Sequence, residues 1–233
     1  MTDRDRPLLA VLIDADNMSA KHAAKIMREV ASIGEPALRR VYGDWSNPSL
    51  KGWKEPIQTL GLVAHQETAN STRKNATDIG LVIHAMDILH TGRFDAFVIV
   101  SSDADFTALV NRLREDGKTV IGIGEQKTNE VLRNVYNRFI LVENIPDPDA
   151  PQTPQKSTAE ASRALPLFRE AIEKIDSEDE WLNLGQVGQA IQARHPDFDS
   201  RTYGFAKLSG LVSALSALET RKDGNRLVIR IKP

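Results

Sequence analysis

Two apolar runs constrain the fold of this chain more than any other feature. Residues 8–13 (LLAVLI) are continuous and apolar, which is typical of a strand buried on both faces of a parallel sheet, and residues 94–100 (FDAFVIV) are the most strand-like run of the chain. From residue 8 to residue 145, such short apolar runs alternate with longer amphipathic stretches. This alternation predicts an α/β fold in which helices cover both faces of a parallel sheet.

The periodicity and the capping residues place the elements of this region. The predicted strands are residues 8–13, 37–42, 62–66, 94–100, 119–123 and 139–142. Helices are predicted at residues 20–33 with Ser19 as their cap, and at 50–60, 77–90, 106–115 and 129–135.

A proline-rich segment divides the chain. Residues 145–157 (IPDPDAPQTPQKS) hold four prolines and no sustained apolar period, which is typical of a semi-extended linker. We therefore expect a first domain over residues 1–146, a linker over 147–160, and a smaller α+β domain over 161–233. In this second domain we expect helices at 164–175, at 183–194 and within 203–218, followed by a strand at 227–231.

Composition excludes several classes of protein. The absence of cysteine rules out a disulfide scaffold, a thiolate zinc site and a cysteine nucleophile. The chain carries 30 basic and 32 acidic residues, so any contact with nucleic acid has to come from local patches rather than from bulk charge. The N-terminal apolar run is too short for a membrane span and lacks a cleavage site, which predicts a cytoplasmic protein without a membrane segment.

Acidic side chains follow two of the predicted strands. Asp14 and Asp16 come directly after the first strand, Asp103 and Asp105 come directly after the 94–100 strand, and Asp78 opens a helix. If these two strands are neighbours, the acids meet at the carboxyl edge of the sheet, where ligands bind in open α/β folds. Clustered carboxylates repel one another unless a cation lies among them, and oxygen ligands suit Mg²⁺ or Mn²⁺. The alternative is that each Asp is a helix cap or a turn residue, which is common after strands.

Four short segments carry a resemblance to a known family. IDADNM, VYGDW, the Lys74–Asp78 segment and SSDADF occur in the order expected of the NYN domain, and the match covers roughly residues 7–145. The NYN domain is a PIN-like nuclease family with a three-layer, Rossmann-like fold. The resemblance implies a ribonuclease that hydrolyses RNA phosphodiester bonds with water activated by Mg²⁺ or Mn²⁺.

The resemblance also implies roles for individual residues. Asp14, Asp78 and Asp103 are the expected metal ligands, Asp105 is a fourth candidate ligand, and Asn17 orients Asp14 or contacts the scissile phosphate. Some NYN proteins bind RNA without cutting it, so a non-catalytic RNA-binding or regulatory adaptor stays open as an alternative. An aspartyl-phosphate phosphatase is a weaker alternative, because Met18 stands where that chemistry usually has Thr or Val.

Basic and aromatic side chains near these acids are candidate RNA contacts. Trp45 and Trp53 flank a segment that contains basic residues, and aromatic faces beside cations suit a single strand. Each tryptophan has a place in the core as its alternative. The candidate contacts are Trp45, Lys51, Lys54, Arg73 and Lys74.

The second domain resembles the OST-HTH/LOTUS domain, which has a winged-helix-like fold. The resemblance rests on LGQVGQAI, HPDFDSRTYGFAKLSGLV and the closing LVIRI, and it covers about residues 161–231. It implies RNA binding, or in some members a protein partner, and self-association is a further possibility for this domain. The candidate RNA contacts are Tyr203, Gly204, Lys207, Arg221, Lys222 and Arg226.

Overall fold

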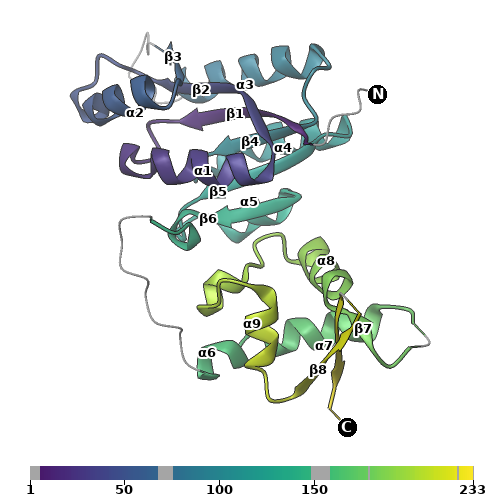
Figure 1. The fold of residues 1–233 in the computed structure, drawn as a ribbon. Helices are drawn as coiled ribbons and strands as arrows, with labels where there is room; N and C mark the ends of the chain where they lie inside the picture. The colour runs from purple at the N-terminus through teal and green to yellow at the C-terminus, as the bar shows by residue number, and fades with distance from the viewer. Residues whose placement is uncertain (1–5, 68–75, 148–157, 178, 225, 233) are drawn as a thin grey trace. The chain divides into compact units, whose positions relative to one another are not determined.

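The computed structural model describes residues 6–67, 76–147, 158–177, 179–224 and 226–232 (Figure 1). The chain divides into two compact units, Met1–Pro148 and Asp149–Pro233. The predicted linker bounds, 147–160, stay a prediction, because residues 148–157 lie outside the described residues.

The first unit contains a six-stranded sheet in the order β3-β2-β1-β4-β5-β6, and every neighbouring pair is parallel. The strands are β1 (Leu8–Asp14), β2 (Glu35–Gly43), β3 (Val63–Gln66), β4 (Ala96–Val100), β5 (Thr119–Gly124) and β6 (Arg138–Leu141). The predicted parallel α/β sheet is confirmed. So is the condition on which the acidic site depends, because β1 pairs directly with β4.

Helices cover the two faces of this sheet (Figure 1). They are η1 (Ala20–His22), α1 (Ala23–Ile33), η2 (Pro48–Trp53), α2 (Lys54–Thr59), α3 (Ala76–His90), η3 (Ala104–Phe106), α4 (Thr107–Glu115), α5 (Glu130–Val135) and η4 (Val142–Asn144). The helix predicted from residue 20 starts as the 3₁₀ turn η1. Ser19 stands at its N-cap, but the Ser19 backbone carbonyl, and not its side chain, accepts the capping hydrogen bond from His22 N–H.

Strand alternation sorts the side chains of the sheet between two cores. Leu9, Val11 and Ile13 pack on the face covered by α1, whereas Ala10 and Leu12 pack on the face covered by α3 and α4. Asp14 lies two residues after Leu12, so its side chain points to the same face, the one that α3 covers. Ser101 lies two residues after Ile99 of β4 and points to that face as well.

The second unit combines helices with a three-stranded antiparallel sheet in the order β7-β9-β8. Its elements are α6 (Thr158–Ser162), α7 (Leu165–Lys174), β7 (Leu182–Asn183), α8 (Leu184–Arg194), η5 (Ser200–Tyr203), α9 (Leu208–Ser213), β8 (Leu218–Asp223) and β9 (Arg226–Ile231). This arrangement agrees with the predicted smaller α+β domain. The strand β8 is absent from the sequence prediction, which placed only a turn before the last strand.

No helix in the described ranges combines the length and the apolar character that crossing a membrane requires.

Candidate functional site

Asp14 lies fully buried at the carboxyl end of β1, where four donors surround its carboxylate. Its Oδ1 accepts hydrogen bonds from the backbone N–H groups of Asp16 (3.1 Å) and Asn17 (3.2 Å). Its Oδ2 accepts from the Asn17 side-chain amide (2.8 Å) and from the Ser101 hydroxyl (2.8 Å). Burial raises the pKa of Asp14, and the hydrogen bonds from Asn17 and Ser101 oppose that rise.

Ser101 links the loops that follow β1 and β4. Its hydroxyl donates to Asp14 and accepts the backbone N–H of Asp103 at 3.1 Å. Asp103 in turn is the N-cap of η3, and its Oδ1 accepts the backbone N–H of Asp105 at 3.0 Å. The capping role expected as an alternative is therefore present at Asp103, but it uses only one of the two carboxylate oxygens.

Asp78 lies half-buried in the first turn of α3 and faces this cluster. Burial, followed by the negative charges of Asp14, Asp103, Asp105 and Asp16, raises the pKa of Asp78 to about 6. Among the described residues, no lysine or arginine forms an ion pair with any of these acids. The cluster is consequently a concentration of negative charge without a compensating cation on the described part of the chain.

The neighbouring residue Thr77 ties α3 to the loop after β1. The buried Thr77 hydroxyl donates to Asp16 Oδ2 at 2.6 Å, while Asp16 itself is exposed. This bond fixes the first turn of α3 beside the end of β1. Asp16 thus positions the helix that carries Asp78.

Three rings form the floor beside Asp14. Tyr42 of β2 is the register partner of Asp14, and His65 of β3 is the register partner of Tyr42. The Tyr42 and His65 rings stack with centroids 5.1 Å apart, and His84 of α3 meets His65 at 4.7 Å. Burial raises the pKa of Tyr42 to about 12 and lowers that of His65, so neither ring carries charge near pH 7 that would offset the acids.

The donor chemistry of the cluster fits Mg²⁺ or Mn²⁺, because both ions prefer carboxylate oxygens. The second oxygen of Asp103 has no hydrogen-bond donor among the described residues. Asp14 is different, since each of its oxygens already accepts two hydrogen bonds. Within the described ranges, no three Asp, Glu or His side chains are arranged so that they could hold a metal ion as they stand. Asp14 fits a cation only where the Asn17 amide or the Ser101 hydroxyl turns away from it.

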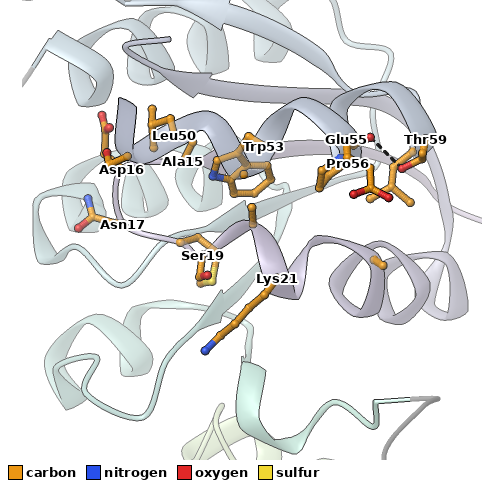
Figure 2. A pocket seen from close by; sticks show the side chains of 16 residues that line it. Ala15, Asp16, Asn17, Ser19, Lys21, Leu50, Trp53, Glu55, Pro56 and Thr59 are labelled. Atoms are coloured by element: carbon orange, nitrogen blue, oxygen red, sulfur yellow. Dashed lines mark hydrogen bonds between the residues drawn. The ribbon is translucent and has the colours of Figure 1, made fainter. Parts of the chain in front are cut away.

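A cavity of about 800 Å³ opens beside the cluster, between the segments that begin with η1 and η2. Its volume lies within the roughly 300–1,000 Å³ that is usual for ligand pockets. Asp16 and Asn17, from the loop after β1, line one end of it, and Trp53 lies along its wall (Figure 2). The acidic cluster and a space of ligand size therefore share the loop at residues 15–17.

The structure distributes the other candidate RNA contacts of the first unit. Lys51 and Lys54 are exposed on η2 and α2. The indole N–H of Trp45 donates to the His65 carbonyl at 2.9 Å, and its ring packs against the core under α1. Trp53 is only 2% exposed and belongs to the same core, so its ring faces are covered. Arg73 and Lys74 lie outside the described residues.

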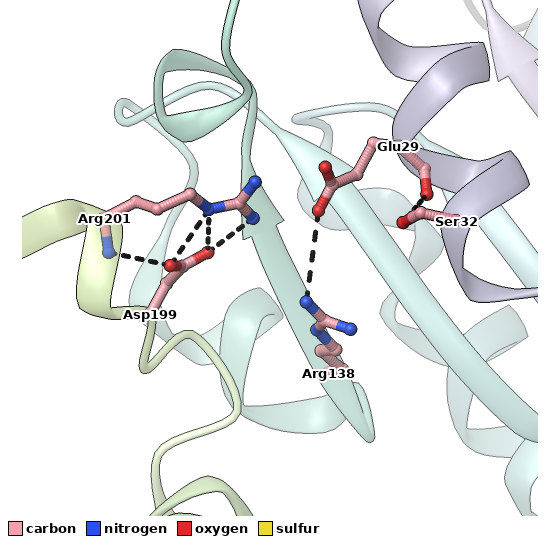
Figure 3. A network of polar contacts seen from close by, with 5 residues as sticks. All are labelled: Glu29, Ser32, Arg138, Asp199 and Arg201. Carbon is pink, nitrogen blue, oxygen red and sulfur yellow. Dashed lines mark hydrogen bonds and ion pairs between the residues drawn. The ribbon is translucent and has the colours of Figure 1, made fainter. Parts of the chain in front are cut away.

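In the second unit, the cations differ in their pairing. Arg201 is held on both oxygens of Asp199 (Figure 3), and Arg230 pairs with Glu219 at 2.6 Å. Tyr203 is half-buried against Phe198. Of the candidate RNA contacts, Lys207, Arg221, Lys222 and Arg226 are exposed and have no ion pair within the described ranges.

The wing formed by β8 and β9 presents part of this set. The Arg221 guanidinium lies 4.5 Å from the ring centroid of Trp181, and the paired Arg230 lies 4.6 Å from it. Trp181 therefore orders Arg221 on the surface of β8 without neutralising its charge.

Sequence reasoning missed Ser101 and Thr77. Both are buried hydroxyls that hold acidic groups of the site, at Asp14 and Asp16. The period of two along β4 is the signal that could have found Ser101, because it places Ser101 on the same face as Phe97 and Ile99.

Comparison with known proteins follows the two units. The family model described as NYN domain matches residues 8–143, and the model described as OST-HTH/LOTUS domain matches residues 159–229. An uncharacterized protein of Methanocaldococcus jannaschii is 25% identical over 140 residues, which are 58% of this chain and 55% of that protein. The chain thus spans little more than half the length of this curated relative.

A solved structure shows the same fold. The crystal structure of a protein of unknown function from Vibrio parahaemolyticus superposes with a TM-score of 0.51 at 18% identity, over 60% of this chain and 94% of that chain. At this identity the likeness concerns the fold alone.

Proposed function

Because the chain belongs to the NYN domain family and carries an OST-HTH/LOTUS domain, we propose that it is a metal-dependent ribonuclease with an RNA-binding module. One observation supports the proposal above the others. Burial, followed by the charges of the aspartates at the ends of β1 and β4, raises the pKa of Asp78 to about 6. A site that gathers negative charge in this way is suited to a divalent cation.

Each side chain has a role in this proposal. Asp14, Asp78 and Asp103 hold Mg²⁺ or Mn²⁺, and Asp105 is a fourth ligand. The bound cation supplies a water of lowered pKa and stabilises negative charge on the phosphodiester. Ser101 orients Asp14, because its hydroxyl donates to Asp14 Oδ2 at 2.8 Å.

The side-chain amide of Asn17 has two proposed hydrogen-bond acceptors, Asp14 and the scissile phosphate. In the structure it donates to Asp14 Oδ2 at 2.8 Å. If that oxygen bound a cation, the amide would be released and would be free to donate to an oxygen of the scissile phosphate. The backbone N–H of Asn17 keeps Asp14 Oδ1 in place during this exchange.

In the second unit, exposed cations serve as phosphate contacts. Lys207, Arg221, Lys222 and Arg226 are proposed to bind the RNA backbone, and the half-buried Tyr203 is proposed as a further RNA contact. Unpaired cations gain most from phosphate, because no internal partner has to be given up. Arg230 takes no such part, since Glu219 already holds it.

A second function, a non-catalytic RNA-binding adaptor, has one specific observation in its favour. All four acceptor positions of Asp14 are filled by donors of the chain itself. A carboxylate satisfied in this way is stable without a cation, as a purely structural role would require.

The two functions are separated by a cleavage assay. Purified chain is incubated with labelled single-stranded RNA, hairpin RNA and DNA in Mn²⁺, Mg²⁺ or EDTA. A ribonuclease cuts RNA only with a divalent cation, and Asp103→Asn lowers the rate at least about 100-fold. The amide oxygen of the substituted side chain can still accept the Asp105 N–H, so the fold is retained.

The matched control is Asp87→Asn, which removes an exposed carboxylate from α3 outside the cluster. This variant should cut at the wild-type rate. RNA that binds but stays intact under every metal condition supports the adaptor, and equal rates for wild type and Asp103→Asn refute the proposed metal site.

A further inference from the structure

We propose that the cavity between η1 and η2 receives the base of one unpaired nucleotide adjacent to the scissile phosphate. The inference rests on the proposed function, since it assigns a subsite to the same substrate. In the proposed function the acidic cluster acts on the phosphate through a cation, and that contact does not distinguish a paired base from an unpaired one. Selection of an unpaired strand therefore needs a separate space within one nucleotide of Asp14.

The cavity has the position that this role requires. Asp16 and Asn17 line it, and their backbone N–H groups both donate to Asp14. A strand whose phosphate lies at Asp14 thus places its neighbouring nucleotide at the end of the cavity. Single-stranded RNA can turn a base out in this way because its bases are not locked in pairs.

An unused donor inside the cavity points to the kind of ligand. Trp53 lines the wall, and its indole N–H has no acceptor among the described residues. This nitrogen is not one of the fully buried side-chain atoms that lack a hydrogen-bond partner in the described chain. It therefore keeps some accessible surface, which lies in the cavity. In Figure 2 it faces the end formed by Ala15, Asp16 and Asn17. Buried indole N–H groups normally find a partner, and every base carries carbonyl or ring-nitrogen acceptors.

The covered ring faces of Trp53 decide how the base is held. With 2% of its surface exposed, Trp53 cannot serve as a stacking platform. It offers only its N–H edge. The base is consequently bound edge-on, between the η2 segment and the η1 segment that Ala20 and Lys21 provide.

Three lysines belong to the segments that form the cavity. Lys21 lines it with its ammonium pointing away from Trp53 (Figure 2), and Lys51 and Lys54 are exposed positions of η2 and α2, adjacent in sequence to lining residues. Within the described ranges none of the three has an ion-pair partner. They are therefore available to the phosphates that flank the inserted nucleotide.

The first test follows the indole directly. The ¹H–¹⁵N signals of the three tryptophan side chains are assigned with Trp45→Phe and Trp181→Phe variants, and the protein is titrated with AMP, GMP, CMP and UMP in EDTA. The Trp53 signal should shift downfield as its N–H gains an acceptor, while the Trp45 signal, already bonded to His65, stays in place. An unchanged Trp53 signal with all four nucleotides overturns the proposal.

The second test fills the cavity without touching the acids. Ala24 lines the cavity on an exposed position of α1, and Ala31 is an exposed alanine of the same helix outside it. Ala24→Leu should weaken binding of a short single-stranded RNA in EDTA about tenfold, which corresponds to about 1.4 kcal/mol. Ala31→Leu, with the same change in helix propensity, should bind like wild type.

The outcomes separate this subsite from the proposed function. If RNA is cut but Ala24→Leu binds and cuts as Ala31→Leu does, the subsite is wrong and the ribonuclease stands. If no RNA is cut while Ala24→Leu still weakens binding and Trp53 responds to nucleotides, the subsite stands without catalysis.

Discussion

Replacing Asp78 by Asn should stabilise the protein at pH 8 when no divalent cation is present. The pKa of Asp78 rises from its ordinary 3.8 to about 6, through burial first and then through the charges of four other aspartates. At 1.36 kcal/mol per pKa unit, this corresponds to at most about 3 kcal/mol. Asp78 is only half-buried, so solvent screening reduces the cost to about 1–2 kcal/mol.

The sign follows from the two pKa values. Below pH 3.8, Asp78 is protonated in the folded and the unfolded chain and costs nothing. Between pH 3.8 and 6 the folded chain keeps a proton that the unfolded chain has released, so stability falls as pH rises. Above pH 6 the full cost is present. Asn removes it, but also removes a carboxylate from the first turn of α3, where the helix dipole favours one by about 0.3–1 kcal/mol.

The net gain expected for Asp78→Asn is therefore about 1 kcal/mol at pH 8 and at most a few tenths at pH 4. Urea unfolding in EDTA at the two pH values measures it, with Asp87→Asn as the control on the same helix. Saturating Mn²⁺ should reverse the order, because binding stabilises the wild type by about 2.7 kcal/mol at 100 times the dissociation constant. An equal gain at pH 4 and pH 8, or a loss at pH 8, refutes the electrostatic account.

Three further changes test other parts of the molecule. Asp14→Asn should abolish cleavage and lower the free energy of unfolding by about 1–3 kcal/mol, because the new amide nitrogen faces hydrogen-bond donors where the carboxylate accepted four hydrogen bonds. Calorimetry that finds this variant as stable as the wild type would contradict the prediction. Gly122→Ala should cost about 1–3 kcal/mol in urea unfolding, since the new Cβ would lie 2.5 Å from the Phe139 ring; a change below about 0.5 kcal/mol would show that β6 gives way. Removing residues 149–233 should raise KM for RNA and leave the single-turnover rate at saturation unchanged, whereas unaltered RNA affinity would favour a protein partner for that unit.

The central strands of the sheet were predictable because the local sequence of each one is enough to identify it. Residues 9–13 and 96–100 are all buried, and burial on both faces leaves a continuous apolar sequence. The strand β8 (LETRKD) has no such pattern, since only Leu218 is buried and the last four residues are exposed. It is an edge strand held by β9 alone, so its identity depends on the partner and not on its own side chains.

The acids of the site were predictable for a related reason. Asp14 and Asp103 stand next to strands whose positions the sequence indicates, and parallel strands end at one edge. The cavity was not predictable, because it depends on how far η1 lies from η2, a distance that no local pattern encodes. Trp53 illustrates the limit: its residue type suits a core and a binding surface equally, and only the structure shows a covered ring with an unused N–H.

The central position of β1 and β4 in the sheet determines at which step of folding the acidic site forms. Asp14 and Ser101 are 87 residues apart, and the hydrogen bond between them closes a long loop of the chain. Pairing of β1 with β2 is local, whereas pairing with β4 is a long-range contact that forms slowly. A growing chain therefore emerges from the ribosome with Asp14, Asp16 and Asp78 before β4 is made. Asp103 and Asp105 join these acids only when β4 docks, so the step that joins the two halves of the sheet also completes the acidic cluster.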